Sequence, residues 1–598
     1  MTVQDEYQAF MDTIEIVPMP ENYRAVMGQR VYQTEKTVQP LFFRTAKNSF
    51  VQMNFAVTVP QRAMLVTEER PEFSHRYKPA DTTILRMGVT VEGGLAASVH
   101  HVGMLQDDDE VKKGDVLMDG GSVEVYWPYQ TRQMVALVNI PEETPPGEYH
   151  GTVRFYSHSM LFDERVAREF PFTIRVENVT IPRGENRKFY LNLWQHIFNA
   201  ARRMEVKPYT QAHLDALRPF CRAYGELGGR VATLVASDIP WNGQGCYNDN
   251  AHPTDFYEYN YIRIRRTADG AYRYDFSFAE KYIAMMEEYG ARDIMLAGLY
   301  GIWGWNETGF ESIVADWPDQ IRVSYINEAD GSLGFMRTRA EIEDYIRAIY
   351  DWLCRKNLLG RTHLMGDEVD LGSASKGWGE SLVIIRRLMP GIQLNWDCGP
   401  ETMCSDACKD MPMHLYTPQI DLWTPASPEE QEELRRRLDA DGHLLWSVCC
   451  HPPVMNSFLY TNLCEVRLHG LITEHLKMEG FIRWNFIGWP EQVREDLRFL
   501  TWPAGDTCFV YPGRGGQCLL SLRYLALRRG IEDFELCQML KAQGGQETVD
   551  AAVNCVVRQP DMRRWDYLDY AGREKYMSLN DADYQRARNL LLDGLTRS

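Results

Sequence analysis

The chain has 598 residues, of which 44% are hydrophobic and 25% are charged. This balance is typical of a folded globular protein, and the length exceeds what one hydrophobic core usually supports, so we expect a multidomain protein with two to four domains. The 64 Lys and Arg residues against 83 Asp and Glu residues give a net charge of −19. A surface of this sign repels polyanions, and no nucleic-acid partner is expected.

No stretch approaches the roughly 18 uninterrupted apolar residues of a membrane span, so none is expected. The acidic residues 1–6 lack the basic and apolar regions of a secretory signal. We therefore expect a cytoplasmic protein, or a secreted or periplasmic one whose leader has been removed. The 13 cysteines have no regular spacing, as in reduced proteins. The His100-His101 pair and the cysteines 404 and 408 lack the spacing of a ligand set, so neither a metal nor another cofactor is expected.

Residues 1–182 predict an N-terminal β-sandwich. Larger apolar side chains fall on alternate positions within 147–155 and within 170–176, as in strands with one buried face. Turn signals such as Pro145-Pro146-Gly147 separate many short strands, and this pattern is typical of a sandwich. The polar segment 177–188 predicts a linker.

Residues 187–500 predict a catalytic (β/α)8 TIM barrel, because apolar strands alternate with amphipathic helices. No G-x-G-x-x-G fingerprint follows the first strand, which disfavours an open nucleotide-binding sheet. The expected strands are residues 189–195, 231–237, 293–299, 363–368, 392–397, 413–418, 443–450 and 480–486.

Three other segments are predicted around the barrel. A hairpin turning at Asp269-Gly270 is inserted before the third strand. A helix spans 338–358, with apolar residues on one stripe. Residues 501–598 predict a C-terminal helical extension packed on the barrel, whose amphipathic first helix includes Leu520, Tyr524 and Leu527.

The candidate catalytic residues are Asp367 and Glu368, which end the fourth expected strand. Active sites of these barrels lie at the carboxyl ends of the strands. One carboxyl group can protonate the leaving oxygen of a glycoside while the other stabilises positive charge at the anomeric carbon. Adjacent residues of a regular strand point to opposite faces, so the pair can share a substrate only if the strand ends or bulges there. Residues 369–372 predict such a break.

Aromatic and polar residues near the other strand ends suit a sugar, whose C–H faces stack on rings while its hydroxyls need hydrogen bonds. Any one of the tryptophans could instead fill the top of the barrel, so only their collective placement indicates a sugar site. The candidate substrate-binding residues are Trp194, His196, Asp238, Trp396, Tyr416, Trp446, Tyr460, Trp484 and Asn485.

Two stretches resemble glycoside hydrolase family 123, the β-N-acetylgalactosaminidases. They are Met365-Gly366-Asp367-Glu368 and the Trp-rich block 480–513. Residues 191–196 and 521–540 support the resemblance, which covers most of 185–540. It implies a β-GalNAc-terminated glycan as substrate, with galacto-configuration taken from the resemblance alone.

The resemblance also implies an exo-acting, retaining, substrate-assisted mechanism. The sugar's own 2-acetamido oxygen would attack the anomeric carbon, and no enzyme nucleophile would be needed. Glu368 would then act as general acid and later as base, while Asp367 would orient the acetamido group and stabilise the oxazolinium-like intermediate.

Two other functions stay open. A retaining glycosidase acting on a neutral β-galactoside-type sugar would need a carboxylate nucleophile from another strand, for which Asp238 and Asp397 are candidates. A non-catalytic carbohydrate-binding protein would keep the cleft without the chemistry, although the presence of both Asp367 and Glu368 argues against it. The sequence predicts no oligomeric state.

Overall fold

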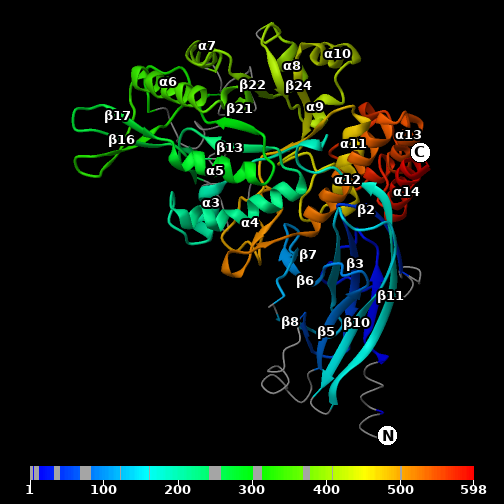
Figure 1. Ribbon diagram of the computed structural model, residues 1–598. Coiled ribbons are helices and arrows are strands. Elements are labelled where there is room, and N and C mark those ends of the chain that lie inside the picture. The colour runs from blue at the N-terminus through cyan, green and yellow to red at the C-terminus, as the bar shows by residue number, and fades with distance from the viewer. Residues whose placement is uncertain are drawn as a thin grey trace.

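The N-terminal strands lie below a barrel, and the C-terminal helices lie beside the barrel (Figure 1). Within the described residues, no helix combines the length and apolar character needed to cross a membrane. The computed structural model describes residues 5, 12–31, 41–67, 83–120, 123–159, 162–240, 257–300, 313–367, 378–406, 408–498 and 502–597.

The N-terminal part of the chain folds into two sheets that share one hydrophobic core. Their strands are β1 (Glu15–Met19), β2 (Leu41–Lys47), β3 (Ser49–Thr58), β4 (Ala63–Val66), β5 (Thr83–Val91), β6 (Ala97–Gln106), β7 (Lys112–Leu117), β8 (Val123–Tyr126), β9 (Thr131–Ile140), β10 (Gly147–Ser159) and β11 (Phe162–Thr180). Over the described residues, one sheet has the order β1-β3-β9-β6-β7 and the other the order β2-β11-β10-β5-β4-β8. Phe55 of the first sheet and Phe155 of the second meet with ring centroids 5.4 Å apart.

The predicted start of the linker 177–188 is wrong, because the strand before it extends to Thr180. Residues 177–180 continue β11, which pairs with β2 through Thr180. The polar pattern was misleading because Glu177 is buried in an ion pair with Arg44 of β2, 2.5 Å long, and Val179 joins the core.

Eight parallel strands form a nearly closed barrel in the described part of the chain. They are β12 (Tyr190–Leu193), β25 (Gly480–Arg483), β24 (Leu438–Ser447), β23 (Met413–Tyr416), β22 (Gln393–Asp397), β21 (Thr362–Asp367), β18 (Asp293–Ala297) and β13 (Val231–Val235), in this spatial order. At the seam between β12 and β13, one bridge joins Leu191 to Gly229. Each of the eight predicted strands is therefore confirmed.

Helices cover the outside of the barrel (Figure 1). They are α3 (Ile197–Arg203), α4 (Gln211–Leu227), α5 (Ser277–Glu288), α6 (Arg339–Arg355), α7 (Trp378–Leu388), α8 (Pro400–Cys404), α9 (Ile420–Trp423), α10 (Pro428–Arg437) and α11 (Leu463–His475). The predicted helix 338–358 is α6. Thr338 and Glu341 begin it with a reciprocal capping box, and Ile342 and Ile346 bury its apolar stripe.

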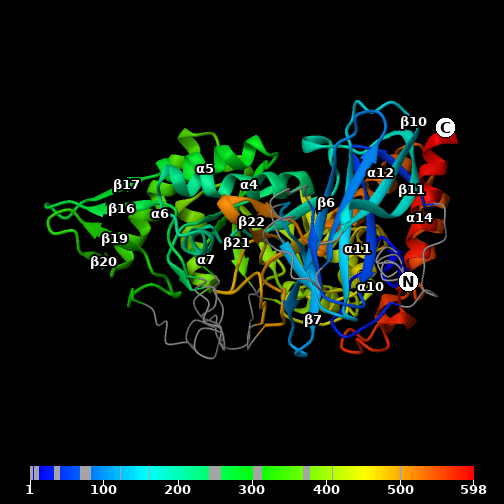
Figure 2. The same ribbon diagram turned by 90° about the horizontal axis from the view of Figure 1, so that it is seen from below.

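The predicted hairpin is confirmed as β16 (Arg263–Arg266) and β17 (Tyr272–Asp275), with Gly270 at φ 86° in the turn. It is part of a larger sheet in the order β17-β16-β19-β20, whose further strands are β19 (Ser324–Asn327) and β20 (Leu333–Phe335). This sheet extends away from the barrel on the side opposite the C-terminal helices (Figure 2).

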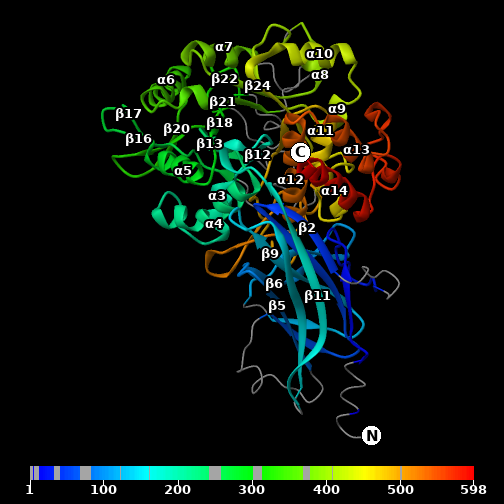
Figure 3. The same cartoon turned by 45° about the vertical axis from the view of Figure 1, so that its right-hand side comes forward.

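The C-terminal helices α12 (Leu522–Ala542), α13 (Gln546–Val556) and α14 (Asp581–Arg597) pack together beside α11 (Figure 3). The expectation of an amphipathic α12 is wrong, because buried residues occur around its whole circumference. Glycines allow the close contact with α11: a Cβ on Gly470 would overlap the carbonyl of Gly530.

Charged residues of α12 are buried in an ionic network that joins three parts of the chain. Arg529 bridges Glu21 beside the N-terminal sheets at 2.8 Å and Glu532 at 2.7 Å. Arg467 of α11 bridges Asp533 at 2.9 Å. Burial alone would raise the pKa of Glu21, but Arg529 and Arg467 lower it to about 2. The network therefore keeps the buried carboxylate of Glu21 charged and paired.

Titratable side chains also fill the amino-terminal end of the barrel. The Tyr190 hydroxyl donates a hydrogen bond to Asp293, 2.8 Å away, and lies 3.5 Å from Nε2 of His363. The His363 ring stacks on His414 with centroids 5.1 Å apart. Burial lowers the pKa of His363 to about 4 and lowers that of His414. Both imidazoles are thus neutral at pH 7.

The His363→Gln variant is expected to weaken the acid sensitivity of the fold. An unfolded histidine has a pKa near 6.5, so between pH 6.5 and 4 the unfolded chain binds more protons and the wild-type free energy of unfolding falls as pH falls. For His363 the loss is up to ~3 kcal/mol. Melting temperatures at pH 7 and pH 4.5 should differ less in the variant than in the wild type. His150→Gln, at an exposed position, is the control and should behave as the wild type. If His363→Gln showed the same difference in melting temperature between the two pH values as the wild type, the acid sensitivity would not come from His363.

Candidate active site

The inward face of the barrel is defined by contacts that cross its interior. Tyr190 of β12 reaches His363 of β21, and Asn192 of β12 lies 3.7 Å from the sulfur of Met295 on β18. None of these strand pairs are neighbours in the sheet. Because side chains alternate along a strand, every second residue from these positions faces inward.

Strand register brings the two acidic residues of β21 and β22 to the same level at the carboxyl end. His363 pairs with Gln393, two residues further Met365 pairs with Asn395, and Asp367 pairs with Asp397. Asn395 and Asp397 therefore face the barrel interior, with Asp397 at the mouth. Neither the side chain of Asp367 nor any part of Glu368 is among the described residues.

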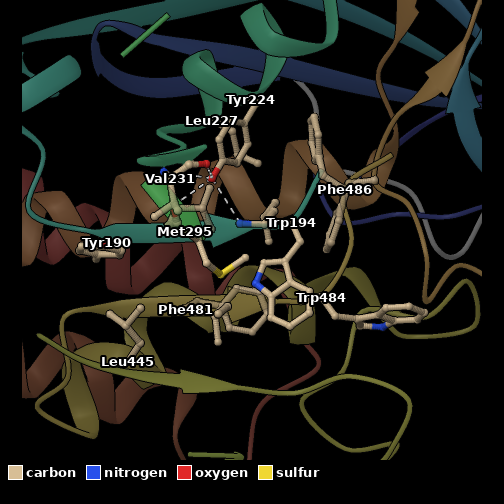
Figure 4. Close-up of a cluster of buried hydrophobic side chains, with 14 of the residues drawn as sticks. Tyr190, Trp194, Tyr224, Leu227, Val231, Met295, Leu445, Phe481, Trp484 and Phe486 are labelled. Atoms are coloured by element: carbon tan, nitrogen blue, oxygen red, sulfur yellow. Dashed lines mark hydrogen bonds between the residues drawn. The ribbon is translucent and has the colours of Figure 1, made fainter. Parts of the chain in front are cut away.

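Two tryptophans lie at the mouth. They follow β12 and β25, which are not neighbours of β21 and β22 in the barrel. Trp194 follows β12, and its backbone N–H donates to the backbone carbonyl of Arg483, 3.1 Å away. Trp484 follows β25, in which Ile482 is paired with inward-facing Asn192. Figure 4 shows both indoles near the end of β12. Two largely buried indoles thus lie at the mouth, on strands distant in the sheet from the acidic strand ends.

His196 lies behind this aromatic surface and supports it. Its Nε2 donates a hydrogen bond to the carbonyl of Trp484 over 3.0 Å, and the two rings meet edge to face with centroids 6.1 Å apart. Burial lowers the pKa of His196 to about 4, so it is neutral at pH 7. Of the predicted substrate-binding residues, Trp194, His196 and Trp484 are therefore brought together.

Three predicted substrate-binding residues lie on the outer face of the barrel instead. The Trp446 indole donates to Thr473 of α11 at 2.7 Å. The Trp396 indole donates to the Pro412 carbonyl at 3.0 Å, and Tyr416, its register partner, packs on Trp423 of α9. Strand alternation explains the correction, because each follows an inward-facing residue and so points the other way. These rings stabilise the barrel–helix interface.

Two more predicted residues hold loops. Both carboxylate oxygens of Asp238 accept backbone N–H groups, from Asn260 at 3.3 Å and from Ser324 at 2.8 Å. Burial raises the pKa of Asp238. This geometry anchors the inserted strands and disfavours a nucleophile at Asp238. Tyr460 packs against Tyr570 of the C-terminal extension with centroids 5.1 Å apart.

Several buried polar groups near the mouth have no hydrogen-bond partner in the described part of the chain. They are the amides of Asn395 and Asn485 and the hydroxyl of Tyr300. A Cβ on Gly366 would lie 2.7 Å from that hydroxyl, which places Tyr300 beside the end of β21. Buried polar groups are normally bonded, and of these only the Asn395 amide is placed by strand register on the inward face of the barrel.

The sequence reasoning identified Asn485 but missed Asn395 and Tyr300. The signal for Asn395 was present, since Gln393, Asn395 and Asp397 place a polar side chain at every second position of β22. Tyr300 had no comparable signal, because it follows its strand in a segment without a regular pattern.

The family model described as glycoside hydrolase 123, catalytic domain, matches residues 194–540. The chain belongs to glycoside hydrolase family 123. Membership of this family makes the protein an enzyme that acts on glycans, so its substrate is a carbohydrate. No curated protein sequence matches this family 123 hydrolase.

Among solved structures, a family 123 glycoside hydrolase from Clostridium perfringens, analysed for the details of glycolipid glycan hydrolysis, is similar with a TM-score of 0.70 and 15% identity over 98% of each chain. This likeness shows a shared fold over nearly the whole length. A Bacteroides ovatus GH5 xyloglucanase has a TM-score of 0.25 and 8% identity, covering 85% of this chain and 100% of the other. A β-D-glucuronidase of Dictyoglomus thermophilum has a TM-score of 0.30 and 11% identity, covering 74% and 68%.

The Asn395→Leu variant of this family 123 hydrolase is expected to be more stable and less active. An unpaired buried amide costs about 1–3 kcal/mol, and Leu of similar shape removes that cost. A higher melting temperature with kcat/KM lowered at least tenfold would fit a ligand-binding amide. Asn260→Leu is the matched control, since that buried amide bonds Tyr345 and Ile262, and its melting temperature should fall. A destabilised Asn395→Leu protein would contradict the interpretation.

Proposed function

We propose that the protein is a retaining, exo-acting β-N-acetylgalactosaminidase that removes terminal β-linked GalNAc from glycans or glycoconjugates by substrate-assisted catalysis. The position of Asp367 at the carboxyl end of β21, immediately before Glu368, carries the proposal. Membership of family 123 supports it. The glycolipid glycan hydrolysis studied in the Clostridium perfringens relative agrees with a glycoconjugate substrate.

In the proposed reaction, Glu368 donates a proton to the glycosidic oxygen as the bond to the anomeric carbon breaks. The acetamido oxygen attacks that carbon from the other face, and the aglycone leaves as an alcohol. Asp367 accepts a hydrogen bond from the acetamido N–H and stabilises the positive charge of the oxazolinium ion. Water then attacks the anomeric carbon while Glu368 removes its proton, and two inversions leave the configuration retained.

The described residues supply binding groups for such a sugar. Trp484 and Trp194 offer apolar surface to its C–H face. The unpaired amide of Asn395 offers hydrogen bonds to hydroxyl or acetamido groups from the interior of the barrel.

A second candidate is a retaining hydrolase of neutral sugars with Asp397 as nucleophile. Its register with Asp367 favours this role, since neighbouring strands lie about 4.8 Å apart and retaining enzymes hold their two carboxyl groups about 5 Å apart. Asp238 is the weaker choice because both its oxygens bind backbone N–H groups.

The Glu368→Gln variant should lose about 10²–10⁴-fold in kcat/KM, because the amide keeps the shape but cannot donate an acidic proton. The assay compares chromogenic β-N-acetylgalactosaminide, β-N-acetylglucosaminide and β-galactoside. Wild-type activity confined to the acetylated galactoside supports the proposal. Full activity in the variant would place the acid elsewhere, and a wild type inactive on all three substrates would favour the non-catalytic binding protein.

Substrates with N-acetyl, N-fluoroacetyl, N-difluoroacetyl and N-trifluoroacetyl groups test the nucleophile. Fluorine withdraws electrons from the amide oxygen, so kcat should fall with each fluorine if that oxygen attacks. With Asp397 as nucleophile, kcat should be nearly independent of fluorine number and Asp397→Asn should abolish turnover. A flat series would contradict substrate assistance.

The architecture of the enzyme is proposed on the same basis. We assign residues 1–182 to an N-terminal β-sandwich, 187–500 to the catalytic barrel and 501–598 to an extension packed on the barrel. The shared core of the two N-terminal sheets supports the first assignment. The contact of α12 with α11 supports the last.

A further inference from the structure

A buried carboxylate, Asp506, lies directly behind the aromatic surface of the mouth. It is fully buried, in the segment that follows the barrel strands. Its Oδ2 accepts the indole N–H of Trp484 at 3.0 Å, and its Oδ1 accepts the guanidinium of Arg483 and the backbone N–H of Cys450 at 3.0 Å. One carboxylate therefore binds two successive residues at the end of β25 and the loop that follows β24.

Arg483 connects the same carboxylate to the loop after β24. Its guanidinium donates to the Val448 carbonyl at 2.9 Å and to the side-chain oxygen of Asn456 at 2.7 Å, while Nε donates to the backbone carbonyl of Asp506. Arg483 and Asp506 are both almost completely buried. A buried pair with its remaining donors satisfied is rigid, since moving either partner leaves an uncompensated charge.

Two aromatic side chains also contact the Trp484 ring. Trp502 meets it edge to face at 4.4 Å and His196 at 6.1 Å, and His196 also bonds its carbonyl. A Trp has two rotatable side-chain bonds, and the hydrogen bond from the indole N–H to Asp506 restricts rotation about both.

We propose that Asp506 is a positioning residue that fixes the orientation of Trp484 as the sugar-stacking wall of the site. The expected effect on kcat/KM rests on the proposed glycosidase function. The orientation of the Trp484 ring itself does not depend on a substrate. A ring held before binding costs less entropy to order on the sugar, and it keeps the anomeric carbon aligned with the acidic residues of β21.

The test is a double-mutant cycle between Asp506→Asn and Trp484→Phe, with the best glycoside of the wild type as substrate. Asp506→Asn should lower kcat/KM about tenfold or more in the wild-type background and less than twofold in the Trp484→Phe background. Its melting temperature should fall in both backgrounds, because Arg483 loses its partner. Equal losses of kcat/KM in both backgrounds would overturn the proposal, since Asp506 would then act through the fold alone.

Trp446→Phe is the matched control, because it also loses a buried indole hydrogen bond but faces α11. It should lower the melting temperature and leave kcat/KM unchanged. If Asp506→Asn does not fold, Trp484→Phe tests the wall that Asp506 positions: kcat/KM lowered at least fivefold supports Trp484 as that wall, and an unchanged value overturns the proposal.

A readout without substrate separates this inference from the proposed function. In protein labelled with 5-fluorotryptophan, the ¹⁹F resonance of Trp484 is assigned by its loss in Trp484→Phe. A single sharp line in the wild type that broadens or splits in Asp506→Asn supports the positioning role, even if no glycoside is cleaved. An identical line in both proteins would overturn it.

Discussion

The contact between α11 and α12 is the constraint on which the rest of the structure depends. Gly470 and Gly530 let the two backbones touch, and a Cβ on either would overlap the other helix. On its barrel side, α11 packs His469 against Trp446 and Phe481, with ring centroids 5.0 and 4.8 Å away. The position of α12 therefore determines where β24 and β25 lie.

The buried charges of α12 extend this constraint to the N-terminal sheets. Arg529 bonds the backbone carbonyl of Phe50 on β3 as well as Glu21, and the Ser49 hydroxyl donates to Glu532. Such pairs give little net stability but strongly disfavour any arrangement that leaves one partner alone. They make the relative placement of sheets, barrel and extension specific. The family 123 fold is shared over 98% of a relative at only 15% identity, which fits a fold set by such packing and not by one sequence.

The mouth of the barrel has the opposite character. The amides of Asn395 and Asn485 are buried without partners in the described part of the chain, at a cost in stability. Behind the mouth, Asp506 and His196 are each hydrogen-bonded to Trp484, the residue that they support. An unpaired amide facing the barrel interior, as at Asn395, and hydrogen-bonded groups behind the mouth are what a preformed binding site requires, since the ligand completes the first and the second hold the site in place.

Hydrophobic periodicity by itself determined the segments 147–155 and 170–176 of the N-terminal sheets, the eight barrel strands, the inserted hairpin and the acidic strand end at Asp367. These features depend on how apolar and polar residues alternate along a short segment, and this pattern is visible in the sequence itself. The sequence of β22 also has a polar residue at every second position, which marks Asn395. The catalytic pair itself came from a short motif, Asp367-Glu368, read together with the family resemblance.

Only the tertiary structure decided which aromatic rings face the site. Trp446 and Trp484 each end a barrel strand, yet one faces α11 and the other the mouth. Their sides depend on strand register around the barrel, which is set by contacts distant in sequence such as that between Tyr190 and His363. The burial of Glu177 and of the charges of α12 was likewise hidden, because a polar residue appears exposed in sequence until its partner from another segment is known.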